Sequence, residues 1–170
     1  GTIREDVSRA IEQACDEIIA GKLHDQFIVD PIQGGAGTST NMNANEVIAN
    51  RAIEILGGKK GDYTLVNPND DVNCGQSTND VYPSCGKMTL HTFALRLLAE
   101  LQRLIDAMDE KAREFDAVVK MGRTQLQDAV PIRLGQEFAA YAAVLRREYR
   151  RIDRARAEQL LLNLGGTAVG

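Results

Sequence analysis

Residues 77–108 read STNDVYPSCGKMTLHTFALRLLAELQRLIDAM and decide the fold of this chain. A polar beginning is followed by apolar residues that are separated alternately by four and three positions: Leu90, Ala94, Leu97, Leu101, Leu104 and Met108. This 3.5-residue repeat is the spacing of helices that pack side by side in bundles. The stretch therefore predicts a long helix that begins near Ser77 or Thr78 and accommodates Pro83 in its early turns.

A second helix with the same repeat is predicted after a break at Met121-Gly122, with its start at Pro131. Its apolar positions are Leu134, Phe138, Tyr141, Leu145, Ile152 and Leu162. In the first long helix, Phe93, Leu98 and Ile105 widen the apolar face beyond the repeat. Two helices cannot bury faces this wide against each other alone. We therefore expect further helices, supplied either by a longer chain or by an oligomer.

The residues before Ser77 predict a small helical domain. Apolar spacing predicts one helix over about 2–20 and another over about 44–56, the second with Asn43 as its N-cap. Residues 59–76 are rich in Gly, Asn and Asp and predict a structured loop. The expected fold is mainly α, with an N-terminal domain at 1–76 and the first part of a central helical bundle at 77–170.

Composition and charge exclude several classes of function. The 170 residues are 44% hydrophobic and 26% charged, and the net charge of −4 argues against a nucleic-acid or membrane-surface partner. We assign the arginine-rich stretch 146–156 to a solvated or interface helix face. No apolar run approaches the roughly 20 residues of a membrane span. Three cysteines at no zinc-like spacing favour a reducing compartment, so we expect a cytoplasmic protein, and two distant histidines predict no metal site.

Three polar clusters are candidates for a binding site, at residues 38–45, 76–80 and 122–128. Each combines Ser, Thr, Asn or Gln with a nearby glycine and precedes a predicted helix. Hydroxyls and amides at a helix N-terminus, together with its unpaired N–H groups, suit carboxylate or phosphate. The alternative is that the clusters are ordinary caps and turns. No Gly-x-Gly-x-x-Gly motif or P-loop is present, which argues against a nucleotide.

Four strings of residues carry a resemblance to a known family. They are GAGTSTNMNANEVIANR at 35–51, GQSTND at 75–80, GRTQLQDAVP at 122–131 and NLGGTA at 163–168. Their residues and their order closely resemble the motifs of the aspartase/fumarase superfamily, and the resemblance extends across nearly the whole chain. The first and third strings look more like the aspartate ammonia-lyase branch than like fumarases, which usually read SGTQTNMN and GRTHTQD there.

The resemblance implies reversible deamination of L-aspartate to fumarate and ammonia, without a cofactor. In this family a base removes a proton from C3 and forms an aci-carboxylate before ammonia leaves from C2. Matched position by position, Thr38, Ser77, Thr78 and Thr124 fall on residues that bind the substrate carboxylates. Asn79 falls on one that contacts the amino-group end, and Gln125 on one that contacts substrate where many relatives have histidine. Cys74 replaces a lysine common in relatives, and we attach no role to it.

The family's catalytic base is absent from this sequence. It is a serine on a string like GSSxMPxKxN, which these 170 residues do not contain. Family chains are more than twice as long and form tetramers whose sites combine regions of three subunits. We therefore expect an N-terminal fragment, inactive alone, of an aspartate ammonia-lyase. A class II fumarase, another lyase of the superfamily and a non-catalytic helical assembly module are the alternatives.

Overall fold

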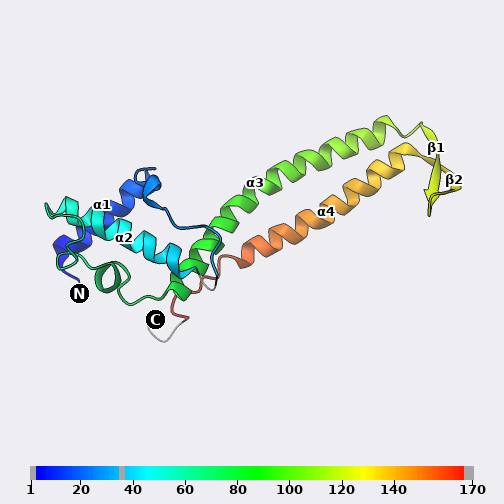
Figure 1. The fold of residues 1–170 in the computed structure, drawn as a ribbon. Coiled ribbons are helices and arrows are strands. Elements are labelled where there is room, and N and C mark those ends of the chain that lie inside the picture. The colour runs from blue at the N-terminus through cyan, green and yellow to red at the C-terminus, as the bar shows by residue number, and fades with distance from the viewer. Residues whose placement is uncertain (1–2, 35–36, 167–170) are drawn as a thin grey trace. The chain divides into compact units, whose positions relative to one another are not determined.

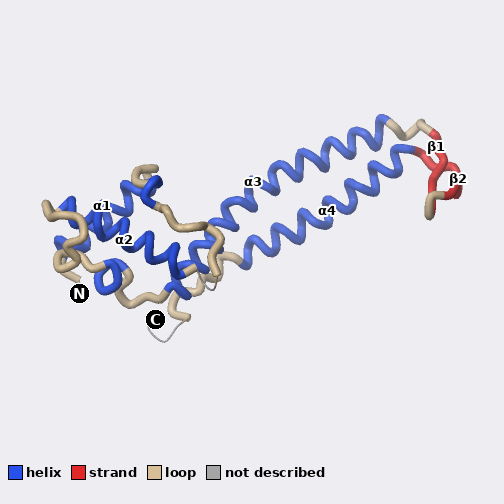
Figure 2. The backbone as a smooth tube through the Cα atoms, viewed as in Figure 1, coloured by secondary structure: helices blue, strands red, loops and turns tan. Residues whose placement is uncertain are grey.

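A computed structural model describes residues 3–34 and 37–166. Two compact units are present, one formed by residues 1–86 with 162–170 and the other by residues 87–161. The described residues are mostly helical and include one two-stranded sheet, as Figure 2 shows by colour. The predicted mainly α fold is confirmed. No helix in these ranges is both long enough and apolar enough to cross a membrane.

The core of the N-terminal unit lies between α1, Glu5–Ile19, and α2, Thr38–Ile55 (Figure 1). Helical spacing brings small and branched apolar side chains to one face of each helix, and the buried ones are Val7, Ala10, Ala49, Ala52 and Ile53. The alanines let the two backbones approach closely, which increases dispersion contacts between them. Val66, from the following loop, is also fully buried in this core.

The loop between α2 and the next helix is structured, as the sequence predicted. It contains a short helical turn, η2, at Pro68–Val72. The Asn67 side chain accepts hydrogen bonds from the N–H groups of Asn69 and Asp70, and the Asp71 carboxylate accepts one from Asn67 at 2.7 Å. An Asn or Asp side chain that accepts hydrogen bonds from the backbone N–H groups of the next residues stabilises such a turn.

The predicted start of α2 at Ala44 is wrong. The helix begins at Thr38, directly after Gly37, whose φ of 80° is readily adopted by glycine. Asn43 is not a cap: its Oδ1 accepts from Ile28 N at 3.0 Å and its Nδ2 donates to Gln26 O at 3.1 Å. Asn41 and Asn43 of the Ser, Thr and Asn run thus make tertiary hydrogen bonds from within the helix.

The long helix α3 spans Thr78–Glu114 and begins where the sequence predicted, with Pro83 in its second turn. In the second unit, α3 is followed by a hairpin of β1, Val119–Thr124, and β2, Gln127–Arg133, in antiparallel register. The helix α4 then spans Leu134–Glu158 and begins with a capping bond in which Arg133 N–H donates to Gln136 Oε1 at 2.8 Å.

Two sequence predictions for this unit are wrong. Pro131 does not begin a helix but lies in β2 opposite Met121. A two-stranded sheet has only edge strands, so a residue without an N–H group is tolerated there. Leu162 lies beyond the end of α4 at Glu158, and the helical repeat therefore stops before it.

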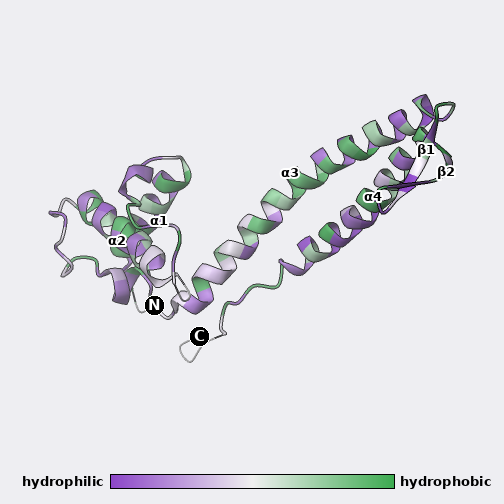
Figure 3. Ribbon diagram, turned by 45° about the vertical axis from the view of Figure 1, so that its right-hand side comes forward, coloured by the Kyte–Doolittle hydropathy of each residue, from purple (hydrophilic) through white to green (hydrophobic). Residues whose placement is uncertain are grey.

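The contact between α3 and α4 uses one half of the predicted repeat, the partly buried Ala94, Leu101 and Met108, together with residues beside it. Leu98 and Ile105 are buried, and so is Ala142 of α4. Gly135 of α4 lies against the backbone of Ala112, where a Cβ would meet the carbonyl oxygen at 2.3 Å. By contrast, the predicted repeat includes strongly exposed residues: Leu90, Leu97 and Leu104. Figure 3 shows that hydrophobic residues recur along α3.

Further contacts fix the register of the α3–α4 pair. Arg146 forms an ion pair with Asp109, and the Phe115 and Phe138 rings pack 5.5 Å apart between centroids. His91 Nδ1 lies 3.2 Å from the carbonyl oxygen of Arg156. This histidine therefore links α3 to α4.

A partly buried ion pair joins α1 to α2, and it predicts a pH dependence of stability. Arg51 donates to both carboxylate oxygens of Glu17, at 2.7 and 3.0 Å, and this hydrogen bonding lowers the pKa of Glu17. A carboxyl group whose pKa is lower in the folded state than in the unfolded state stabilises the fold at pH values above its unfolded pKa. This contribution is lost as the pH falls through the folded pKa. Glu17→Gln should therefore destabilise the chain at pH 7, with a difference from wild type that shrinks toward pH 3.

Denaturant unfolding at the two pH values measures this difference. Glu5→Gln is the matched control, because the Glu5–Arg9 pair on α1 is exposed and contributes little. A pH-independent effect of Glu17→Gln would show that the ion pair is not its origin.

Candidate functional site

The first candidate cluster lies in the first turns of α2. Thr38 and Ser39 are exposed in the first turn, where helix N–H groups lack intrahelical partners. Gly37, directly before them, is buried against Tyr82 of α3, and a Cβ there would lie 2.3 Å from the tyrosine ring. Glycine is therefore required at this position by close packing as well as by its positive φ.

The second cluster is the start of α3, and its residues cap their own helix. Ser77 Oγ accepts from Asn79 N at 3.2 Å, and the Asp80 carboxylate accepts from Ser77 N at 2.9 Å. This is a capping box in which aspartate takes the place usually held by Glu or Gln. Ser77 is thus a helix cap, as in the alternative that the polar clusters are ordinary caps and turns. Thr78 is partly exposed and Asn79 is exposed.

A buried amide joins the two clusters. Asn41 of α2, which is 6% exposed, donates from Nδ2 to Thr78 Oγ1 at 3.0 Å, and Asn73 Oδ1 lies 3.4 Å from the same nitrogen. Together with the Gly37–Tyr82 contact, this bond brings the N-termini of α2 and α3 next to each other. Thr38, Ser77, Thr78 and Asn79 are thus assembled in one unit, at two helix ends whose dipoles favour an anion.

The third cluster has a different setting from the one predicted. Thr124 and Gln125 do not precede a helix; they lie at the tip of the β1–β2 hairpin, in the other unit. Gln125 and Leu126 form the two-residue turn with φ values of 46° and 64°. Two positive φ values are those of a type I′ turn, for which Asn-Gly is the usual sequence. The missing Asn or Gly explains why sequence reasoning overlooked the hairpin.

Sequence analysis also missed the residues that support the first two clusters. Asn41 and Asp80 lie inside the quoted strings but were not assigned a role, and Ser84 follows them on α3. All three are buried polar residues. Their spacing could have identified them. A polar residue three or four positions from a predicted binding residue on a helix lies on the same face as that residue.

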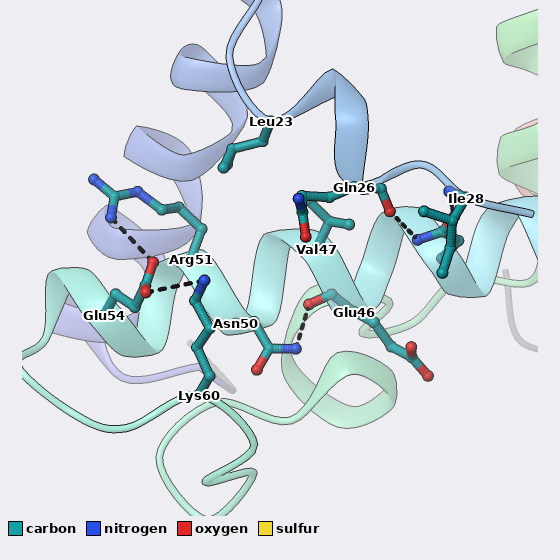
Figure 4. A pocket seen from close by; sticks show the side chains of 10 residues that line it. Leu23, Gln26, Ile28, Glu46, Val47, Asn50, Arg51, Glu54 and Lys60 are labelled. Carbon is teal, nitrogen blue, oxygen red and sulfur yellow. Dashed lines mark hydrogen bonds and ion pairs between the residues drawn. The ribbon is translucent and has the colours of Figure 1, made fainter.

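The pocket in Figure 4 lies apart from these residues, on the part of α2 beyond its first turn. Its volume is about 300 Å³, and charged side chains of Glu46, Arg51, Glu54 and Lys60 line it. Glu54 is held by Arg51 and by Lys60, each at 3.2 Å. Because both cations of this pocket are paired with Glu54, they are not available as donors to a carboxylate ligand.

Other reactive groups are not arranged as a catalytic set. In the described ranges no three His, Cys, Asp or Glu side chains converge as metal ligands, and no disulfide joins the cysteines. Burial raises the pKa of the Cys15 thiol, which disfavours its thiolate. His24 Nε2 lies 2.9 Å from Ile18 O, at the end of α1.

Comparison with known proteins gives consistent matches. The family described as lyase matches residues 1–170. An aspartate ammonia-lyase of Bacillus subtilis (strain 168) is 59% identical over 98% of this chain, and one of Helicobacter pylori (strain 26695) is 56% identical over all of it. The chain spans 35% and 36% of the lengths of these relatives.

Two solved structures are also similar to this chain. The crystal structure of fumarate lyase:delta crystallin from Brucella melitensis bound to cobalt superposes with a TM-score of 0.88 and 56% identity, over 99% of this chain and 36% of that one. The class II fumarase of Schistosoma mansoni superposes with a TM-score of 0.87 and 40% identity, over 100% of this chain and 36% of that one.

The hairpin turn predicts a stabilising substitution. Leu126 is 99% exposed and has a left-handed backbone, which costs a residue with a Cβ roughly 1–2 kcal/mol. Leu126→Gly should remove this strain and stabilise the fold by about 0.5–1 kcal/mol after the greater unfolded-state entropy of glycine is subtracted. Denaturant unfolding measures the change. Leu126→Ala is the control, because alanine removes the side chain but keeps the Cβ; equal effects of the two substitutions would exclude strain as the cause.

Proposed function

This chain belongs to the lyase family, and from that premise we propose that it is part of an aspartate ammonia-lyase, which interconverts L-aspartate with fumarate and ammonia. The observation that carries the proposal is the pair of helix N-termini joined through Asn41 and Thr78, with the hydroxyls of Thr38, Ser77 and Thr78 beside them. Its support from relatives is the identity of 59% and 56% to enzymes of that name.

The chemistry explains why neutral donors suit this site. Removal of a proton from C3 of aspartate places a second negative charge on the neighbouring carboxylate. Fixed hydroxyls and helix dipoles stabilise that charge without reorganising as it forms. We assign Thr38, Ser77, Thr78 and Thr124 to the carboxylates, Asn79 to the amino-group end and Gln125 to a further substrate contact.

The proton transfer itself is assigned to residues outside these 170. Gln125 has an amide side chain, which neither gives nor takes a proton near neutral pH. The proposed reaction uses no organic cofactor, because the leaving ammonia departs from a carbanion that the substrate's own carboxylate stabilises. We also propose 1–76 as an N-terminal lyase domain and 77–170 as the first part of the central bundle, whereas the compact units divide after Gly86, so that the first two clusters lie in one unit.

We further propose a homotetramer as the active assembly. Its support is the stripe of α3 that α4 leaves uncovered, formed by Leu90, Phe93, Leu97 and Leu104, which are 42–61% exposed. These positions repeat at heptad spacing, as the seam of a helical bundle does. A reducing cytoplasm as the location is supported by the absence of a disulfide within the described residues.

The function is tested with the full-length protein and aspartate, by following fumarate absorbance. Thr38→Val removes an exposed hydroxyl that makes no hydrogen bond within the described residues, and it should lower kcat by about 10²–10³-fold, as loss of one transition-state donor does. Ser39→Ala, which removes the neighbouring hydroxyl, is the control and should retain activity. Malate formation from fumarate, without turnover of aspartate, would favour a fumarase instead.

The assembly is tested by sedimentation of the full-length protein. Leu97→Glu places a charge in the uncovered stripe and should shift the tetramer toward smaller species, because an unpaired charge is costly to bury. Gln102→Glu, an exposed position of α3 outside the stripe, should leave sedimentation unchanged. A Leu97→Glu protein that sediments like wild type would contradict the assignment of this stripe to a subunit interface.

A further inference from the structure

Two buried polar residues of α3 have no place in the proposed reaction. Asp80 is 1% exposed and Ser84 is 5% exposed. They are four positions apart on one helix and therefore lie on the same face, one turn from each other. A buried carboxylate is costly unless hydrogen bonds satisfy it, so its partners indicate what it holds in place.

The two oxygens of Asp80 bind segments that are far apart in the sequence. Oδ2 accepts from Ser77 N at 2.9 Å, at the start of its own helix. Oδ1 accepts from Gly166 N at 3.0 Å, in the segment that follows α4. One carboxylate thus connects a residue of the proposed site to a segment 86 residues further along the chain.

Ser84 holds the other end of the same segment. Its Oγ accepts from Asn163 N at 3.0 Å and donates to the Asp80 carbonyl oxygen at 2.6 Å. Residues 163–166 form a tight turn in which Gly166 N donates to Asn163 O at 3.0 Å, and Gly165 has a φ of 77°. Asp80 and Ser84 therefore bind the last and the first residue of this turn, so that it is attached to α3 at two points.

The Asp80 carboxylate also acts on a residue that carries a proposed binding group. Ser77 Oγ is oriented by Asn79 N, and the Ser77 backbone is oriented by Asp80. Without the carboxylate, the Ser77 N–H loses its partner, and the cap that fixes the first turn of α3 loosens. A displacement of about 1 Å in such donors costs up to 10²-fold in rate.

We propose that Asp80 is a positioning residue, which fixes Ser77 and Thr78 for catalysis by tying the start of α3 to the turn at 163–166. This proposal rests on the proposed function. Asp80 does not touch the substrate; it acts through Ser77. The turn at 163–166 therefore supports the proposed site, because the Asp80 carboxylate binds both this turn and the start of α3.

The test combines amide hydrogen exchange with kinetics of the full-length protein. Asp80→Asn keeps the shape of the side chain but leaves one acceptor oxygen for two N–H groups. Exchange at Ser77 and Gly166 should accelerate by tenfold or more. kcat on aspartate should fall by about 10–100-fold, with KM changed by less than threefold. Asp106→Asn, at an exposed position of α3, is the matched control and should change neither.

A double-mutant cycle separates positioning from a general loss of stability. If Asp80 acts through Ser77, Asp80→Asn combined with Ser77→Ala should lower kcat/KM no further than Ser77→Ala does. Multiplicative losses would overturn the proposal, and so would unchanged exchange at Ser77 in an Asp80→Asn protein.

A second variant keeps the test decisive if Asp80→Asn fails to fold. Ser84→Ala removes the Asn163 attachment and the hydrogen bond to the Asp80 carbonyl oxygen but keeps the Asp80 carboxylate, and it should accelerate exchange at Asn163 and, more weakly, at Gly166. Unchanged exchange at both would overturn the two-point attachment. A wild-type protein that does not turn over aspartate would overturn the proposed function and the positioning role together, and exchange in Asp80→Asn would still report whether the carboxylate holds the turn.

Discussion

The start of α3 must satisfy its unpaired backbone N–H groups while it lies against two other segments, and the N-terminal unit is organised around that constraint. Ser77 and Asp80 cap the helix, Asn41 reaches Thr78 from α2, and Asp80 also binds Gly166. Because Asn41 and Asp80 make these bonds from buried positions, an apolar substitute could not replace either of them. The polar residues at this helix start therefore form a connected network.

Such a network has consequences for chemistry. Donors that are held by buried bonds do not have to reorganise when charge develops on a ligand, and this is the main source of electrostatic stabilisation in enzymes. The cations Arg51 and Lys60 of this unit are paired with Glu17 and Glu54. In the proposed reaction, neutral hydroxyls and helix ends would favour a dianion without holding it so tightly in the ground state that release becomes slow.

The second unit obeys a different constraint. Its two long helices bury a narrow seam containing Leu98, Ile105 and Ala142, while a parallel apolar stripe of α3 remains exposed. A helix with two apolar stripes is stable in water only when a second partner covers the other one. Stability and assembly are therefore linked in this part of the protein, whereas the N-terminal unit has a core of its own.

The sequence by itself determined the helical class, the start of α3 at Thr78 and the presence of more apolar surface than two helices bury, because period and capping are local properties. It also identified the polar clusters by their Ser, Thr, Asn and Gln residues, and the resemblance to a family implied roles for residues within them. Only the tertiary structure decided that α2 begins at Thr38, that Pro131 lies in a strand and that Leu98 rather than Leu97 faces α4. It likewise decided that Asn41 joins two helix ends and that Asp80 holds a distant turn. The physical reason is the same in each case: these outcomes depend on bonds and contacts between residues far apart in the chain, which no local pattern encodes.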